Sequence, residues 1–162
     1  MIRIKNFNPF SINMGPFSGR GCPDVHYRPT VADWVLDGVA LLLVLLGWVA
    51  VLVLYREQGG RVSGEVWAAA VSSVLVFALL AAGARVPVRF INFPVRVGAH
   101  NIGRQYVLAV RLMRALNICL CLLFASGPLS EHYAWSKVLM LVSLGLLVLS
   151  LAVYYVLAFR YK

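Results

Sequence analysis

"WVLDGVALLLVLLGWVAVLVLY", residues 34–55, is an apolar stretch interrupted by a single charged residue, Asp37. A helix of about 20 residues crosses the roughly 30 Å hydrocarbon core of a bilayer while its backbone polar groups stay bonded within the helix. Over the whole chain of 162 residues, 61% are hydrophobic, against about 45–50% in soluble domains. The stretch therefore predicts a transmembrane helix.

Three further segments have the same apolar character: 66–84, 106–126 and 134–159. The loop between the first two spans is short, so these spans should form a helical hairpin. Gly127 and Pro128 directly follow the span at 106–126 and are typical of the end of a helix. Soluble helices of this length would show a polar face, which these segments lack. We expect an all-α membrane protein in which residues 34–162 form a bundle of four transmembrane helices.

Residues 1–33 precede the first span and are rich in Asn, Pro, Gly and Ser, without helical or strand periodicity. They contain no apolar run long enough for a signal peptide. We expect a largely irregular cytoplasmic segment. Its Phe7, Phe10 and Phe17 are more aromatic than a solvating tail needs, so the segment could dock on this protein's own cytoplasmic face or on a partner.

The basic residues are distributed unevenly along the chain, whose net charge is +9. Twelve of the fifteen lie before the first span, between the second and third spans and on the start of the third, or at the C-terminus. The positive-inside rule then predicts that both termini are cytoplasmic. Nucleic-acid binders carry a dense basic face on a soluble scaffold, so we expect no nucleic-acid partner. Four arginines of the long connection are candidate contacts for anionic lipid headgroups or a partner: Arg85, Arg89, Arg96 and Arg104.

Asp37 is the acidic residue that most needs explaining. Asp33 can close a capping box with Thr30 at the start of the first helix, but Asp37 lies a full turn deeper, where a carboxylate requires a partner. The third helix enters from the same side and carries Arg111 and Arg114 at comparable depth. We therefore predict that Asp37 pairs with Arg111 or Arg114. The alternative is that both arginines extend to lipid phosphates and Asp37 reaches water.

Signals for catalysis or metal binding are missing from the sequence. Cys119 and Cys121 are two apart on a helix, so their side chains diverge by about 200° and cannot share one metal ion. The three histidines fall in separate connecting segments, and the sequence contains neither a nucleophile motif nor a Gly-rich phosphate loop. We expect a non-enzymatic protein with no cofactor, no metal and no catalytic residues.

Two stretches together resemble a known family: "INFPVRVGAHNIGRQYVLAVRLMRAL", residues 91–116, and "VADWVLDGVALLL", residues 31–43. They are similar to small bacterial inner-membrane proteins, common in the Bacteroidetes, that are related to the SdpI-type immunity and signalling proteins. That family reads approximately Phe-Asn-Tyr-Pro-Val-Lys, then Glu-Arg-Gln-Tyr, then Arg-Leu-x-Arg-x-Leu. The matching residues are Asn92, Phe93, Pro94, Val95, Arg96, Arg104, Gln105, Tyr106, Arg111, Leu112, Arg114 and Leu116.

The resemblance implies a multi-pass protein of the bacterial inner (cytoplasmic) membrane. The chain departs from the family in the loop at residues 56–65, which lacks the family's Pro-x-His-Phe element. Most of the family has no assigned activity, so the resemblance implies fold and location more than function.

Three functions are compatible with these observations. The first is an accessory or regulatory subunit that acts through its basic cytoplasmic face, with membrane lipids and another membrane protein subunit as partners. The second is an SdpI-like immunity or signalling protein. The third is a small transporter or channel component, which would need a polar pathway. Small and polar residues inside the spans are instead typical of helix packing: Gly47, Ser72, Ser73, Asn117, Ser143, Gly145 and Ser150.

Overall fold

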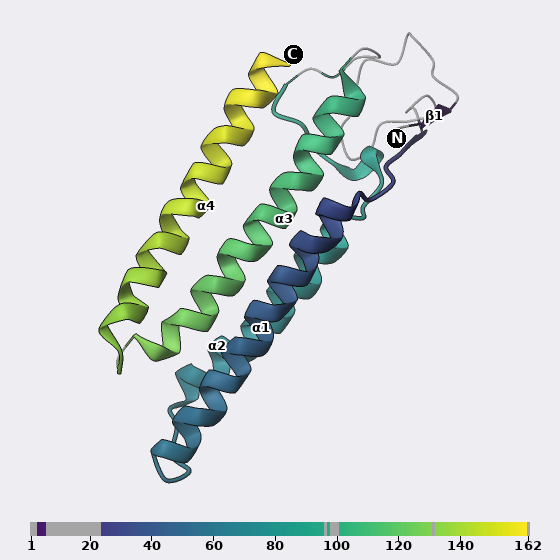
Figure 1. The fold of residues 1–162 in the computed structure, drawn as a ribbon. Coiled ribbons are helices and arrows are strands. Elements are labelled where there is room, and N and C mark those ends of the chain that lie inside the picture. The colour runs from purple at the N-terminus through teal and green to yellow at the C-terminus, as the bar shows by residue number, and fades with distance from the viewer. Residues whose placement is uncertain (1–2, 6–23, 96, 98–100, 131, 162) are drawn as a thin grey trace.

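The described residues form four long helices in the computed structural model (Figure 1). The helices are α1 (Val31–Glu57), α2 (Gly64–Gly83), α3 (Ile102–Ser126) and α4 (Ala134–Arg160). Each is long and apolar enough to cross a membrane, as the sequence predicts. The structure describes residues 3–5, 24–95, 97, 101–130 and 132–161.

The helices extend beyond the predicted spans at their polar ends. Helix α1 begins at Val31, before the apolar run, because Thr30 and Asp33 form a capping box. Helix α3 begins at Ile102, one turn before the predicted span. An apolar run marks only the part of a helix that faces hydrocarbon, so it underestimates helices that continue into the interface.

Two short strands lie in the N-terminal segment, which the sequence predicts to be largely irregular. Strand β1 (Arg3–Lys5) pairs antiparallel with β2 (Asp24–His26), with Ile4 opposite Val25. Three residues are too few to show strand periodicity in a sequence, which is why this pairing was not predicted. The expected docking of Phe7, Phe10 and Phe17 falls outside the described residues.

Helix α3 is the centre of the arrangement. It contacts each of the other three helices, whereas α4 packs mainly against α3 (Figure 1). An apolar cluster of Ala40, Val44 and Cys121 joins α1 to α3, and Phe77 of α2 packs against it. The start of α1 and the end of α4 lie at one end of the bundle, here called the terminal end, and the α1–α2 and α3–α4 loops lie at the other, the loop end (Figure 1).

The α2–α3 connection folds against the terminal end of the bundle. It contains a 3-10 turn, η1 (Val88–Phe90), and a second such turn, η2 (Gly127–Leu129), lies in the α3–α4 connection. Val88 and Val97 are buried against Tyr106 of α3, whose hydroxyl donates a hydrogen bond of 2.9 Å to the Val86 carbonyl. The connection is therefore part of a second apolar core at the terminal end.

Candidate functional site

The first turn of α1 holds a carboxylate in a network of hydrogen bonds. The Thr30 backbone N–H and hydroxyl donate to Asp33 Oδ2 at 2.7 and 2.8 Å. The Tyr27 hydroxyl donates to the same oxygen. An acidic residue in this position also suits the positive end of the helix dipole. Asp33 is thus held at the start of α1 by three donors, and its other oxygen remains available to a neighbouring helix.

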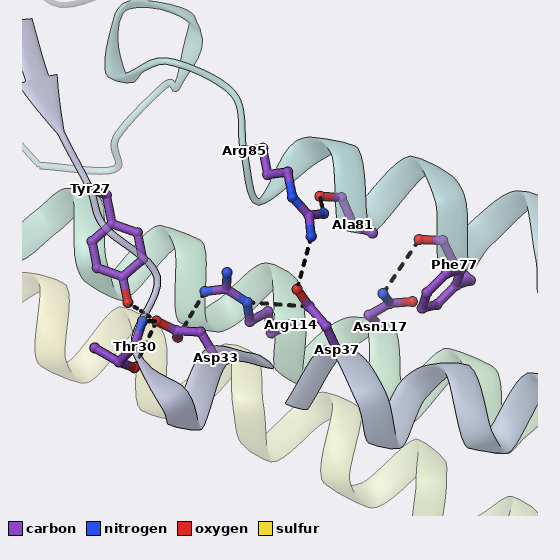
Figure 2. A network of polar contacts seen from close by, with 9 residues as sticks. All are labelled: Tyr27, Thr30, Asp33, Asp37, Phe77, Ala81, Arg85, Arg114 and Asn117. Carbon is purple, nitrogen blue, oxygen red and sulfur yellow. Dashed lines mark hydrogen bonds and ion pairs between the residues drawn. The ribbon is translucent and has the colours of Figure 1, made fainter. Parts of the chain in front are cut away.

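Arg114 of α3 binds both carboxylates of α1 (Figure 2). Its Nη1 lies 2.8 Å from Asp33 Oδ1, and its Nε donates to Asp37 Oδ1 at 3.2 Å. Asp33 and Asp37 are four residues apart, so they lie on one face of α1. The side chains of Arg114 and Asp33 are each 2% exposed, and that of Asp37 is 11% exposed. One guanidinium therefore fastens α1 to α3 in the interior of the bundle.

Arg85, just after α2, completes the cluster (Figure 2). Its Nη2 lies 3.3 Å from Asp37 Oδ2, and its Nη1 donates to the Ala81 carbonyl at 2.7 Å. The guanidinium also stands over the Trp34 ring, 5.9 Å from its centroid. Two carboxylates face two guanidiniums, so the charges of the four side chains balance. We call Asp33, Asp37, Arg85 and Arg114 the charge cluster; it joins α1, α2 and α3.

Tyr27 covers the charge cluster at the terminal end. The Arg114 guanidinium carbon is 6.0 Å from the centroid of the Tyr27 ring, which also meets the Tyr106 ring edge-on at 6.2 Å. Burial, with the hydrogen bond to Asp33, raises the pKa of the Tyr27 hydroxyl above its ordinary value of 10.0. The hydroxyl therefore stays protonated and continues to donate to Asp33 at neutral pH.

Polar side chains beyond the cluster form hydrogen bonds within the bundle. Asn117, one turn from Arg114, donates to the Phe77 carbonyl of α2 at 3.4 Å and accepts from the Cys121 thiol at 3.4 Å. Ser73 donates to the Ala70 carbonyl at 2.7 Å. These contacts are interhelical or local, and they stabilise packing around α3.

Of the two arginines predicted to pair with Asp37, only Arg114 lies beside it. Arg111 is exposed and forms no ion pair among the described residues. The two arginines are three positions apart and so differ by about 60° around α3, which is enough to turn Arg111 away from α1. Asp33, interpreted as a cap alone, is a second partner of Arg114. The four-residue spacing of Asp33 and Asp37 was the signal that could have indicated a shared cation.

The four arginines predicted to contact lipid or a partner have different surroundings. Arg85 belongs to the charge cluster, although half of its side chain remains exposed. Arg104 is exposed and stands over the Tyr161 ring, 5.6 Å from the centroid. The side chain of Arg89 and all of Arg96 lie outside the part of the chain that the structure describes.

The described residues contain no group of three or more His, Cys, Asp or Glu side chains that could hold a metal ion. Cys119 and Cys121 are buried and free. Chemically, the charge cluster offers two carboxylates that are already paired, and its clearest role is to fix how α1, α2 and α3 meet.

Comparisons of the chain with protein-family models, with curated proteins and with solved structures find no match.

Proposed function

We propose that this chain is a non-enzymatic protein of the bacterial inner membrane that acts as an accessory or regulatory subunit through its basic terminal end. The proposal is supported first by the segregation of charge. Asp33 and Asp37 are the acidic side chains described at the terminal end, and both are bound by Arg114 or Arg85. The remaining basic side chains there have no such partner among the described residues.

This segregation is the observation that carries the proposal. Four exposed arginines come from three parts of the chain at the terminal end, namely the segment before α1, the first half of α3 and the end of α4: Arg28, Arg104, Arg111 and Arg160. They create a positive face beside the second apolar core, and such a face attracts an acidic protein surface or anionic headgroups. By the positive-inside rule, this end would face the cytoplasm.

The helices also leave much apolar surface for neighbours in the membrane. Only 6% of an apolar stretch of 18 residues in α4 is buried against the rest of the chain. A small membrane protein of this kind can add a helix face to a larger assembly without an active site of its own.

Purification in a mild detergent followed by native mass spectrometry tests the proposal. We expect one protein to co-purify with the wild-type chain in a constant ratio. Arg104→Glu should lose it, because the substitution reverses charge on the exposed face without touching the charge cluster. Arg61→Glu, in the exposed α1–α2 loop at the loop end, is the matched control and should retain it.

Two results would contradict the accessory role. If no protein co-purifies and the chain alone conducts ions in liposomes, it is a transporter or channel component. If it protects cells from a toxin without any partner, the immunity function of the resembling family applies. Equal retention of the partner by Arg104→Glu and Arg61→Glu would place the contact away from the basic face.

A further inference from the structure

A groove runs between α3 and α4 on the side away from the charge cluster. Its volume is about 340 Å³. The walls are mostly aliphatic, with Leu108, Leu112 and Ala115 from α3 facing Leu149, Val153 and Leu157 from α4. No acidic residue lines this groove. In a chain that spans a bilayer, such a groove opens toward the acyl chains.

Arg111 is the charged residue in the lining of this groove. It is exposed, and it has no carboxylate partner among the described residues. Arg114, one turn further along α3, is buried and held by two carboxylates. Of these two arginines on neighbouring turns, only Arg111 has a guanidinium that is free to bind a ligand.

The depth of Arg111 follows from the charge cluster. Arg114 contacts Asp33, the third residue of α1, so the middle of α3 is level with the beginning of α1. Arg111 lies three residues nearer the terminal end, about 4.5 Å along the helix axis. Its long side chain can extend toward the surface, as those of membrane arginines commonly do. A guanidinium extended in this way can reach the level of the lipid phosphates.

We propose that the α3–α4 groove is a binding site for one anionic phospholipid of the surrounding bilayer. Arg111 binds the headgroup phosphate, and the aliphatic walls below it hold an acyl chain. The complementarity is between an unpaired guanidinium within a largely aliphatic groove and a molecule with an anionic head and an apolar tail. The site requires that the helices span a bilayer, but not that the terminal end binds a protein partner.

Lipid titration of the detergent-purified protein, followed by native mass spectrometry, tests the site. We expect phosphatidylglycerol to bind more tightly than phosphatidylcholine of the same chain length. Arg111→Gln should weaken phosphatidylglycerol binding about tenfold, because it removes one charge-assisted contact. It should weaken phosphatidylcholine binding less, because the choline cation beside that phosphate offsets its charge. Arg61→Gln, another exposed arginine at the loop end, should change neither.

A second variant tests the groove separately from the charge. Ala115→Leu narrows the groove and should weaken the binding of both lipids, whereas Ala152→Leu on the exposed surface of α4 should weaken neither. If Arg111→Gln does not fold, Arg111→Lys replaces it and should keep the preference for phosphatidylglycerol.

Three outcomes would overturn the site. Equal losses in Arg111→Gln and Arg61→Gln would mean that only net charge matters. Full binding of both lipids by Ala115→Leu would show that no acyl chain occupies the groove. Competition by inorganic phosphate as effective as that of phosphatidylglycerol would assign Arg111 to a free anion instead of a membrane lipid.

Discussion

Arg114 is a buried cation whose two carboxylate partners come from consecutive turns of α1. A charge taken out of water is costly, and its partners offset that cost only when they are close and themselves hydrogen-bonded. Both conditions hold here, since Thr30 and Tyr27 also bond Asp33. The ion pairs therefore contribute more to the register between α1 and α3 than to net stability. They determine which turn of α1 lies beside which turn of α3.

The first prediction concerns the loss of this cation. Arg114→Met should destabilise the protein by about 3–5 kcal/mol, because two buried carboxylates lose their shared partner. Combining it with Asp33→Asn and Asp37→Asn should recover most of that loss, since no unpaired buried charge then remains and Arg85 is half exposed to water. Denaturant unfolding in detergent micelles measures both changes.

Arg111→Met is the matched control for that experiment, because Arg111 is exposed and unpaired among the described residues. It should unfold within about 0.5 kcal/mol of the wild type. A simple exchange of charge between Asp37 and Arg114 should not restore stability, since the new carboxylate would face Asp33. Equal effects of Arg114→Met and Arg111→Met would show that the cluster has no structural role.

The second prediction concerns pH. The folded protein raises the pKa of Tyr27, so the corresponding stabilisation is complete below the unfolded pKa of about 10 and is lost as pH rises through the folded value. Tyr27→Phe should cost about 1.5–3 kcal/mol at pH 7, because a hydrogen bond to a charged group disappears. It should also reduce the loss of stability above pH 10.

Unfolding curves of wild type and Tyr27→Phe between pH 7 and about 11 give the stability difference at pH 7 and the loss of stability above pH 10. Taking the difference between the two proteins cancels the contributions of the other tyrosines. Parallel pH profiles would mean that the Tyr27 hydroxyl does not bond Asp33.

At the scale of elements, α1 and α3 approach each other closely at one glycine. A Cβ at Gly47 would lie 3.3 Å from both the Cα and the Cβ of Ala125, whereas a Cβ at Gly145 in α4 would meet nothing within 4 Å. Both glycines were interpreted from sequence as packing residues. The structure gives that role to Gly47 and leaves Gly145 in open space.

The third prediction follows from this contrast. Gly47→Leu should cost about 1–3 kcal/mol, because the added side chain forces α1 away from α3. Gly145→Leu should be neutral or stabilising, since leucine has the higher helix propensity and meets no neighbour. Thermal unfolding of the two variants in the same detergent compares them directly. Similar losses at both positions would contradict the close α1–α3 contact.

The number of helices could be predicted from sequence because apolar length alone determines it. The pairing of charged residues between helices was harder to predict. Asp37 could be recognised as needing a cation, but choosing between Arg111 and Arg114 needs the rotation of α3 about its axis, which residue spacing does not give. The connection at residues 85–97 was interpreted as a connector, and the burial of Val88 and Val97 could not be foreseen because irregular segments have no period.

On the scale of the whole molecule, charge is distributed unevenly between the two ends of a membrane-spanning bundle. The terminal end holds the exposed Arg28, Arg104, Arg111 and Arg160, while Asp33 and Asp37 are bound inside the charge cluster. The loop end carries Arg56, Arg61 and Lys137, but also the exposed acidic residues Glu57 and Glu65. The proposed partner contact requires that the terminal end face the cytoplasm, whereas the proposed lipid site requires only that the bundle span the bilayer.

Cysteine accessibility in intact cells tests this arrangement most directly. Single cysteines replace Arg61 at the loop end and Arg160 at the terminal end, in a chain in which Cys22 is serine and the buried Cys119 and Cys121 are unchanged. Once the outer membrane is permeabilised, Arg61→Cys should react with a membrane-impermeant maleimide. Arg160→Cys should react only after the inner membrane is opened as well. Reaction of Arg160→Cys while the inner membrane is intact would contradict the account.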